Sequence, residues 1–597
     1  MPTWVLGLSA FYHDAAACLL RDGELVLAVE EERLSRIKHD HGYPARAIAA
    51  CLDTAGITPA DVDLVVFYEK TLPKLERQLE TWLGAFPRSL GAFVRSMSRY
   101  LDGRIDLRRW LERRGGFRGD ILFSEHHLSH AAFAYFTSPF FLDTPDQDTA
   151  VLVSDGVGEW TTTSLWTAGP AGITPQREIH FPDSLGLFYS LITAHLGFEV
   201  NEGEYKVMGL AAFGDDTFAP EMARLLPFLD DGAFRLDRRY LHLGGHHRLA
   251  SPALDALLGP PRLPGDPITQ RHRDLARSAQ ARLEDALLRI EATLPAGQPL
   301  CYGGGVALNG AANARLAARR PLHVSFAPGD SGAAIGAAYV GHYLASTKGS
   351  ATLSDSATLS DSATLSDSAT LSDSAARSTN PPHRISITPY LGPAFTPDAC
   401  LEAARALGLT ARPLSSLGGD AFLAQRLADG AILGWVDGRM EFGPRALGAR
   451  SLLADPRRAT MRDAINERIK RREPFRPFAP IVLAEHTADF FDDPRPSPWM
   501  TEIRPVRPER RHDLAAVVHV DGTARLQTLR RDDAPRLHDL IRAFAAITGV
   551  PALLNTSFNV AGEPIVCTPE DACRCFRTAG LDGLVLGEVW IEPEPRP

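Results

Sequence analysis

Two histidines spaced by four residues open an apolar helical run. His126 and His130 stand just before the small, apolar segment 131–135. Residues four apart on a helix lie on one face with Cβ atoms about 6 Å apart, so the two imidazoles can bind one metal ion. A solvated or helix-capping histidine cluster is the alternative. His127 occupies the position that is glutamate in metalloproteases of the H-E-x-x-H type, which disfavours that chemistry.

Two aspartates could complete such a site. Asp155 follows the apolar segment 149–154, at a strand end where α/β proteins usually meet their ligands. Asp330 precedes the segment 331–338, whose small residues predict a helix that begins at Asp330. An Asp-Gly pair at a strand end is also a common turn. Two histidines with two aspartates would suit iron, manganese or zinc and would leave positions open for phosphate oxygens.

Glycines and a lysine of the same region could bind a nucleotide. Gly304 and Gly305 follow the predicted short strand 300–302. Glycines at a strand-to-helix junction let backbone N–H groups approach phosphate or ribose oxygens, although a run of glycines is not specific to nucleotides. Lys206 could neutralise a phosphate, but an isolated lysine is usually a surface residue.

The densest group of basic residues lies in the C-terminal part of the chain. The segments 439–451 and 470–476 combine arginine and lysine with glycine, proline and phenylalanine. Arginine and lysine are natural ligands of a doubly charged phosphate, and arginine offers a planar bidentate fork. A solvated basic helix face would explain residues 470–472 alone, but not the F-R-P-F-A-P segment 475–480. Further on, the segment 555–559 (N-T-S-F-N) leaves an apolar strand with many polar side chains.

Two regions of strands and helices must position these residues. Strands are predicted at 5–8, 15–20 and 25–29, with an Asp-Gly turn before the last, and a second strand–turn–strand unit covers 149–166. The repetition predicts a duplicated α/β domain that binds its ligand between the halves. The C-terminal region alternates helices with apolar strands, which predicts a second α/β domain.

A low-complexity segment divides the chain. Residues 351–374 are four copies of A-T-L-S-D-S. Such short polar repeats bury too little apolar surface to offset their ordering entropy, so we predict a flexible linker at 346–383. A β-solenoid is the rival interpretation, although solenoid repeats need more apolar residues per turn. The predicted domains are therefore 1–345 and 384–597.

Composition and charge exclude several classes of protein. The 597 residues are 45% hydrophobic and 23% charged, which excludes wholesale disorder, collagen and coiled coil. The net charge of −10 has the wrong sign for a surface that binds nucleic acid throughout, so we expect no nucleic-acid partner. The seven cysteines lack C-x-x-C spacing, which indicates neither a disulfide framework nor a zinc–thiolate site. Without a signal-peptide pattern or a membrane-length apolar run, we expect a cytoplasmic protein with no membrane partner.

Taken together, the motifs resemble those of the O-carbamoyltransferase family of nodulation factors and antibiotics. The resemblance extends over nearly the whole chain and implies an actin-like (ASKHA) N-terminal domain joined to a YrdC-like α/β C-terminal domain. The matching motifs are Y-H-D-A-A-A (12–17), H-H-L-S-H (126–130), D-G-V-G-E (155–159), K-V-M-G-L-A-A-F-G (206–214), G-G-V-A-L-N (304–309), G-P-R-A-L-G-A-R-S (443–451), F-R-P-F-A-P (475–480), H-V-D-G-T-A-R (519–525) and N-T-S-F-N (555–559).

The resemblance implies a reaction in two stages. In the second domain, carbamoyl phosphate would be cleaved to carbamate and phosphate, and carbamate would attack the α-phosphate of ATP to give carbamoyl-adenylate and pyrophosphate. In the first domain, a hydroxyl of a small-molecule acceptor would attack the adenylate, and AMP would leave. ATP and carbamoyl phosphate are then co-substrates, and a divalent metal (iron, alternatively manganese or zinc) is the cofactor.

The resemblance also assigns ligand-binding residues. The implied metal ligands are His126, His130, Asp155 and Asp330. The implied nucleotide site includes Gly304, Gly305 and Asn309, together with Lys206. The implied ligands of carbamoyl phosphate are Arg445, Lys470, Arg476 and Ser557, with Asn555 close by.

Two further residues are catalytic candidates. His13 would activate the acceptor hydroxyl, because an imidazole with a pKa of about 6.5 can accept a proton at neutral pH. Orienting the carbamoyl group, or simply packing, are the alternatives for His13. Lys38, with the adjacent His39, lies in a similar family motif and is the second candidate.

Two other functions stay open beside this one. An enzyme that transfers threonylcarbamoyl to tRNA would use the same two domain types, but the negative net charge and the lack of an extended basic stripe weigh against it. An ATP-binding protein of this fold without turnover would not need the acids, imidazoles and guanidiniums that are all present. Sugars, aminoglycosides, macrolides and lipo-oligosaccharides all carry suitable acceptor hydroxyls, and no pattern indicates the oligomeric state.

Overall fold

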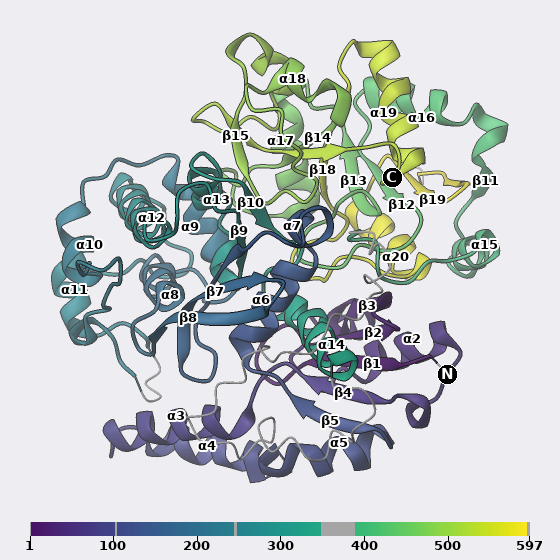
Figure 1. Ribbon diagram of the computed structural model, residues 1–597. Helices are drawn as coiled ribbons and strands as arrows, with labels where there is room; N and C mark the ends of the chain where they lie inside the picture. The colour runs from purple at the N-terminus through teal and green to yellow at the C-terminus, as the bar shows by residue number, and fades with distance from the viewer. Residues whose placement is uncertain (1, 102–103, 244–247, 348–387, 594–597) are drawn as a thin grey trace. The chain divides into compact units, whose positions relative to one another are not determined.

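The computed structural model describes residues 2–101, 104–243, 248–347 and 388–593 (Figure 1). The chain forms two compact units. The first unit comprises residues 1–26 and 43–387, and the second comprises residues 27–42 and 388–597. The linker predicted at 346–383 lies outside the described residues, except for residues 346 and 347 at the end of a helix.

The N-terminal strands form a sheet that belongs to the first unit except for residues 27–30 of β3, which are counted with the second. Its order is β3-β2-β1-β4-β5, and the strands are β1 (Trp4–Ser9), β2 (Ala16–Arg21), β3 (Glu24–Glu30), β4 (Leu64–Phe67) and β5 (Asp120–Phe123). β1 pairs antiparallel with β2, Leu6 opposite Leu19, and parallel with β4, Leu6 opposite Val65. β1 and β4 are buried on both faces, which is why they are nearly continuous apolar runs in the sequence.

A second sheet repeats this arrangement. Its order is β8-β7-β6-β9-β10, and the strands are β6 (Thr149–Ser154), β7 (Thr161–Gly169), β8 (Gly172–His180), β9 (Leu300–Gly303) and β10 (Leu322–Val324). β6 pairs antiparallel with β7 and parallel with β9, as β1 does with β2 and β4. Three consecutive strands followed by two parallel ones thus occur twice, which is the architecture of an actin-like (ASKHA) domain. The predicted duplicated α/β fold is confirmed.

Two helices link the sheets of the first unit. α14 (Asp330–Thr347) packs against β1, β2 and β4, α6 (His126–Phe136) packs against β6 and β9, and the two helices pack against each other (Figure 1). Small residues permit this close approach, because a Cβ at Gly336 would collide with the carbonyl oxygen of Ser129 and one at Gly7 with that of Ala334. The packing therefore determines where both helices begin relative to the ends of the strands.

The remaining helices of the first unit connect these strands. They are α2 (Ala45–Ala55), α3 (Thr71–Gly84), α4 (Leu90–Leu101), α5 (Leu107–Gly115), α7 (Pro139–Asp143), α8 (Leu185–His195), α9 (Glu204–Ala211), α10 (Ala219–Leu225), α11 (Pro252–Leu258), α12 (Gln270–Glu291) and α13 (Gly310–Ala317). Across the described parts of both units, no helix combines the length and the apolar character needed to cross a membrane.

The second unit is built on a larger sheet. Its order is β11-β20-β19-β12-β13-β18-β14-β17, and the strands are β11 (Ala411–Pro413), β12 (Leu433–Val436), β13 (Arg450–Ala454), β14 (Ala479–Leu483), β17 (Gln527–Leu529), β18 (Ala552–Ser557), β19 (Gly583–Leu586) and β20 (Val589–Ile591). β15 (Ile503–Pro505) pairs with β16 (Thr523–Arg525). The helices are α1 (Glu31–Ser35), α15 (Pro397–Ala406), α16 (Asp420–Ala428), α17 (Ala459–Ile465), α18 (Thr487–Phe490), α19 (Pro535–Thr548) and α20 (Pro569–Ala579). The predicted α/β character of this region is confirmed.

Strand register brings three separated motifs together in the second unit. β18 lies between β13 and β14, with Asn555 opposite both Leu453 and Ala479, and Ser557 opposite Ser451. The segments 443–451, 475–480 and 555–559 therefore meet at one end of this sheet.

Candidate active site

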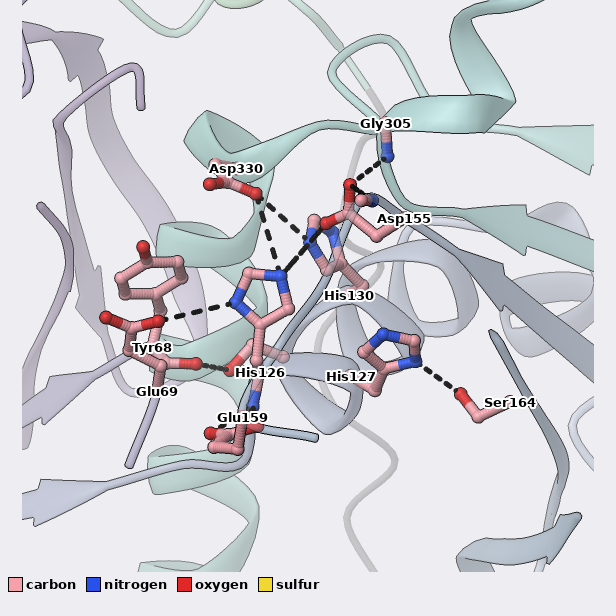
Figure 2. Close-up of polar contacts among 12 residues, drawn as sticks. Tyr68, Glu69, His126, His127, His130, Asp155, Glu159, Ser164, Gly305 and Asp330 are labelled. Atoms are coloured by element: carbon pink, nitrogen blue, oxygen red, sulfur yellow. Dashed lines mark hydrogen bonds and ion pairs between the residues drawn. The ribbon is translucent and has the colours of Figure 1, made fainter. Parts of the chain in front are cut away.

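Four side chains of the first unit meet in one cluster, as Figure 2 shows. The ligand atoms of His126, His130, Asp155 and Asp330 all lie within 4.8 Å of one another. Asp155 Oδ2 is 3.0 Å from His126 Nε2 and 3.3 Å from His130 Nε2. Asp330 Oδ1 is 3.7 Å and 3.5 Å from the same two nitrogens. The structure thus brings together the four residues predicted to bind a metal, which we call the His/Asp cluster.

Each member of the His/Asp cluster stands at the end of an element. His126 begins α6 and His130 follows one turn later, Asp155 comes directly after β6, and Asp330 begins α14. The Glu159 carboxylate accepts hydrogen bonds of 3.0 and 3.2 Å from the His126 backbone N–H, which stabilises the start of α6. The packing of α6 against α14 therefore positions the whole cluster.

The electrostatics of the His/Asp cluster favour a cation. Burial alone would lower the pKa of His130, but hydrogen bonds to Asp155 and Asp330 raise it to about 9. Burial would raise the pKa of Asp155, but its hydrogen bonds to His126 and His130 hold it well below the usual range. Positive charge is thus stabilised here, and a divalent ion could take the place of the bound protons.

The residues present fit a divalent metal ion. Two imidazole nitrogens and two carboxylates form a donor set that suits iron, manganese or zinc. Asp330 Oδ2 is buried without a hydrogen-bond partner among the described residues, which leaves an acceptor for such an ion. His127 points away, with its Nδ1 2.7 Å from Ser164 Oγ, so it stays outside the donor set (Figure 2).

A buried ion pair lies behind His126. Glu69 Oε2 is 3.9 Å from His126 Nδ1, and Lys74 Nζ is 2.7 and 2.8 Å from the two oxygens of Glu69. Metal-binding histidines commonly direct their second ring nitrogen toward a carboxylate, which orients the ring. Sequence reasoning missed Glu69, although its place just after β4 was a signal, since strand ends in α/β proteins usually carry ligand-binding residues.

Of the residues predicted to bind a nucleotide, Gly304 and Gly305 lie beside Asp155 and Ser154. The Gly305 N–H donates to Asp155 Oδ1 at 3.3 Å, and a Cβ at Gly304 would collide with the Ser154 carbonyl oxygen. Asn309 Oδ1 accepts from the backbone at the start of α13 and from Gln280 Nε2 at 3.0 Å. The Asn309 amide is thus engaged within the protein.

Lys206 is placed by a different element from the glycines. It lies on α9, with Nζ 5.5 Å from the centroid of the Phe198 ring. Its role toward a nucleotide stays a prediction.

His13 lies in the loop between β1 and β2. Its Nδ1 is 2.6 Å from Asp14 Oδ2. Burial would lower the pKa of His13, but the hydrogen bond and charge of Asp14, with smaller contributions from Asp330 and Asp155, raise it to about 9. An imidazole protonated at neutral pH donates hydrogen bonds rather than accepting a proton, so this geometry fits the alternative in which His13 orients the carbamoyl group.

Lys38 belongs to the second unit, whereas His13 belongs to the first. Burial is the largest cause of the lowered pKa of Lys470, and the positive charge of Lys38 is one of several smaller contributions. The structure therefore places Lys38 in the electrostatic surroundings of the predicted carbamoyl phosphate residues.

Lys470 is a buried lysine that ends the helical segment Asn466–Lys470 and reaches the last residue of β18. Its ammonium group donates to the Ser557 carbonyl oxygen at 2.5 Å, to the Asn559 carbonyl oxygen at 3.0 Å and to Asn559 Oδ1 at 2.7 Å. Burial holds the pKa of Lys470 well below its usual value, and the nearby Arg472 lowers it further. Lys470 thus holds the turn that presents Ser557.

Four guanidinium groups of the second unit act on one another electrostatically and form what we call the arginine cluster: Arg445, Arg472, Arg476 and Arg525. Burial holds the pKa of Arg525 well below its usual value, and the charges of the other three lower it further. Arg525 Nε is buried without a hydrogen-bond partner among the described residues. Like charges gathered in this way are relieved by a bound anion of two or more charges.

Arg525 and Asn555 extend the predicted set. Sequence reasoning gave Arg525 no role, although the motif 519–525 ends on it at the close of β16. Asn555 Nδ2 donates to the Ala446 carbonyl oxygen at 3.1 Å and to Gln527 Oε1 at 2.7 Å, so it supports the loop that carries Arg445.

Comparison with known proteins bears on both units. The family described as Carbamoyltransferase N-terminus matches residues 4–339, and Carbamoyltransferase C-terminus matches residues 424–593. An uncharacterized protein of Synechocystis sp. is 42% identical over 634 aligned positions, which cover 100% of this chain and 97% of the relative. Nodulation protein NolNO of Sinorhizobium fredii is 37% identical over 98% of this chain and 79% of its own length. The 3'-hydroxymethylcephem-O-carbamoyltransferase of Amycolatopsis lactamdurans is 40% identical over 36% of this chain and 39% of its own length.

Solved structures resemble the chain in fold alone. Component A of the (R)-2-hydroxyglutaryl-CoA dehydratase of Acidaminococcus fermentans is 14% identical with a TM-score of 0.30, over 58% of this chain and 99% of that one. HypF of T. kodakarensis is 13% identical with a TM-score of 0.28, over 58% of this chain and 49% of that one.

The family matches and the nearly full-length relatives agree with the motif resemblance, and the two side-chain clusters lie within the matched segments. The chain therefore belongs to the carbamoyltransferase family, whose relatives here include a named O-carbamoyltransferase, and it is a carbamoyltransferase.

Proposed function

We propose that this protein is an ATP-dependent O-carbamoyltransferase that uses carbamoyl phosphate and a small molecule bearing an acceptor hydroxyl. In the second unit, water cleaves carbamoyl phosphate to carbamate and inorganic phosphate. A carbamate oxygen then attacks the α-phosphorus of ATP, the bond to the bridging oxygen breaks, and pyrophosphate leaves. The product is carbamoyl-adenylate.

The arginine cluster is the observation that carries this proposal. Burial lowers the pKa of Arg525, and the charges of Arg445, Arg472 and Arg476 lower it further. The charges of Arg472 and Arg476 also lower the pKa of Lys470, which donates a hydrogen bond to the Ser557 carbonyl oxygen. A phosphate dianion relieves that repulsion and accepts bidentate hydrogen bonds from arginine. The net charge of −10 weighs against an extended nucleic-acid backbone, so we favour carbamoyl phosphate over tRNA as the ligand of these arginines.

Transfer would take place at the His/Asp cluster of the first unit. The acceptor oxygen bonds to the carbamoyl carbon of the adenylate, the bond from that carbon to the phosphate oxygen breaks, and AMP leaves with the electron pair while the hydroxyl proton passes to solvent. A divalent ion held by His126, His130, Asp155 and Asp330 would neutralise phosphate oxygens and stabilise the leaving AMP. His13, held by Asp14, would donate a hydrogen bond to the carbamoyl oxygen, where negative charge develops.

The direct test follows products in a mixture of the protein, ATP, magnesium, carbamoyl phosphate and ferrous or manganous ion. Pyrophosphate should form only when carbamoyl phosphate is present, and a carbamoylated product should appear when an acceptor sugar or aminoglycoside is added. Absence of pyrophosphate with both substrates present contradicts the proposal.

A matched pair of variants locates the first stage. Arg445→Met should lower pyrophosphate formation by at least about tenfold, because it removes a guanidinium from the phosphate pocket. Arg574→Met removes an exposed arginine of α20 and should leave the rate unchanged. Equal rates in the two variants would remove Arg445 from the proposed site.

A further inference from the structure

The segment 27–42 comes from the N-terminal part of the chain and yet belongs to the second unit. It contains consecutive charged residues that are almost completely buried: Glu30 is 4% exposed and Arg33 is 3% exposed. Burying charged groups costs free energy unless each is paired. The hydrogen-bond partners of Glu30 and Arg33 therefore indicate the role of these two side chains.

Glu30 and Arg33 hold one residue from both sides. Glu30 Oε1 accepts a hydrogen bond of 2.6 Å from the Gly443 backbone N–H. Arg33 donates a hydrogen bond of 2.7 Å from a terminal guanidinium nitrogen to the Gly443 carbonyl oxygen. Arg33 also pairs with Glu32, whose other oxygen accepts the His39 N–H at 2.8 Å. We call this arrangement the Gly443 clamp: Glu30 and Arg33 on the Gly443 peptide groups.

Gly443 is a position where the backbone needs such support. Its φ of +109° lies in the region that side chains other than glycine rarely adopt, and Pro444 has no N–H to donate. Arg445, the predicted phosphate ligand, follows directly. The direction in which the chain leaves Gly443 therefore sets where the Arg445 guanidinium can reach.

The other side of Arg445 is held by residues of the C-terminal region itself. The Ala446 carbonyl oxygen accepts from Asn555 Nδ2 at 3.1 Å. The Leu447 N–H donates to Glu441 Oε1 at 2.7 Å, and the Leu447 carbonyl oxygen accepts from Gln527 Nε2 at 2.8 Å. Arg445 thus stands between two anchored stretches of backbone, and the anchor before it comes from more than 400 residues away.

We propose that Glu30 and Arg33 are positioning residues for carbamoyl phosphate: through the Gly443 clamp, the N-terminal segment sets the backbone from which Arg445 contacts the phosphate. This inference rests on the proposed function, because it concerns the binding of carbamoyl phosphate by Arg445. It adds that the phosphate site of the second unit is incomplete without residues encoded before residue 40.

The same segment supplies a matched control. Arg36 donates to the carbonyl oxygens of Ile565 and Pro564 at 2.6 and 3.0 Å, and pairs with Asp571 at 3.5 Å. Arg36 therefore ties segment 27–42 to the second unit by the same kind of bond, but through the backbone of residues 564 and 565 and not through Gly443. A general loosening of the segment should affect both anchors alike.

The experiment compares variants in carbamoyl-phosphate-dependent pyrophosphate formation by the full chain. Glu30→Leu removes the acceptor for the Gly443 N–H and should raise the KM for carbamoyl phosphate about tenfold or more, with the KM for ATP unchanged. Glu30→Gln keeps an oxygen that accepts the same hydrogen bond and should restore the wild-type KM. Arg36→Met should lower the unfolding temperature without changing the KM for carbamoyl phosphate.

The outcomes separate the inference from the proposed function. If the wild-type protein neither forms pyrophosphate nor binds inorganic phosphate in a calorimetric titration, the proposed function fails and this inference fails with it. If the wild type does both but Glu30→Leu keeps its KM for carbamoyl phosphate, or Arg36→Met raises that KM equally, only the inference is overturned. Should Glu30→Leu not fold, Arg33→Lys provides the same measurement, and an unchanged KM in that variant overturns the inference as well.

Discussion

Both side-chain clusters of this protein bring several charged groups together, but the signs of the charges differ. In the first unit, Asp155 and Asp330 balance the paired imidazoles of His126 and His130. In the second unit, the charges of Arg445, Arg472 and Arg476 add to burial in lowering the pKa of Arg525, and an anion bound there would relieve this repulsion. The carboxylates of the His/Asp cluster therefore fit the metal cation that we propose there, and the guanidinium groups of the arginine cluster fit the proposed phosphate.

Glu30 offers a test of buried charge at the residue scale. Burial raises its pKa to about 7, even though Arg33 and the Gly443 N–H act in the opposite direction. Below the unfolded value of 4.5 both states hold the proton. Between 4.5 and about 7 the unfolded state has lost its proton while the folded state keeps it, so the free energy of unfolding falls as the pH rises and levels off above about 7. Glu30→Gln has no proton to lose, so its free energy of unfolding should increase relative to that of the wild type between pH 5 and pH 8, by about a few kcal/mol at most.

Thermal unfolding at both pH values checks this prediction, and Glu563→Gln is a control at another glutamate, one that is exposed. A constant difference between Glu30→Gln and the wild type across this pH range would mean that Glu30 is charged throughout.

At the scale of elements, the contact between α6 and α14 matters most, because each helix begins with residues of the His/Asp cluster. Gly332 and Gly336 lie on the face of α14 that approaches α6, where an added Cβ would meet Ala327 and Ser129. Residues on two helices can converge within hydrogen-bonding distance only if the helices are held this closely. Packing in this protein is therefore a condition for ligand geometry as well as for stability.

Gly336→Ala tests this dependence. The added methyl group must displace α14 from α6, which we expect to cost about 2 kcal/mol or more of stability and to weaken metal binding by moving Asp330. Gly84, at the end of α3, has open space around its Cβ position, and Gly84→Ala should change stability by less than about 1 kcal/mol. Calorimetric unfolding measures the change in stability, and manganese titration measures the change in metal affinity. An unchanged metal affinity in Gly336→Ala would show that the packing of α14 against α6 does not control metal binding.

At the scale of the whole molecule, the two clusters lie in different units. The His/Asp cluster belongs to the first unit, and the arginine cluster belongs to the second. Under the proposed function the reaction is divided accordingly, with phosphate chemistry at the arginine cluster and transfer at the His/Asp cluster. Each stage should respond separately to the loss of its own ligands.

Metal removal should expose this division. After dialysis against a chelator and return to magnesium, carbamoyl-phosphate-dependent pyrophosphate formation should persist, whereas carbamoylation of the acceptor should fall by about a hundredfold and recover with ferrous or manganous ion. Magnesium prefers oxygen ligands and does not replace these ions at a site with two imidazoles. His126→Ala should behave like the chelated protein without recovery. Loss of both activities on chelation would contradict the division.

Much of this organisation could be predicted from the sequence. The repeated strand pattern at 5–29 and 149–166 predicted the duplicated fold, because strands buried on both faces are apolar runs separated by polar turns. The spacing of His126 and His130 predicted a shared helix face, and Asp155 and Asp330 were recognised as element ends. Each of these signals depends on residues that are close in the chain.

The tertiary structure alone decided the rest. It places segment 27–42 in the second unit, joins Glu30 to Gly443 across 413 positions, and brings Arg525 into the field of Arg445, Arg472 and Arg476. It also shows that Lys470 donates hydrogen bonds to the turn at residues 557–559. The sequence by itself determined which helices and strands form and which residue types they carry. Which side chains come into contact was decided by packing between segments that are distant in the chain, because such packing gives no local pattern in the sequence.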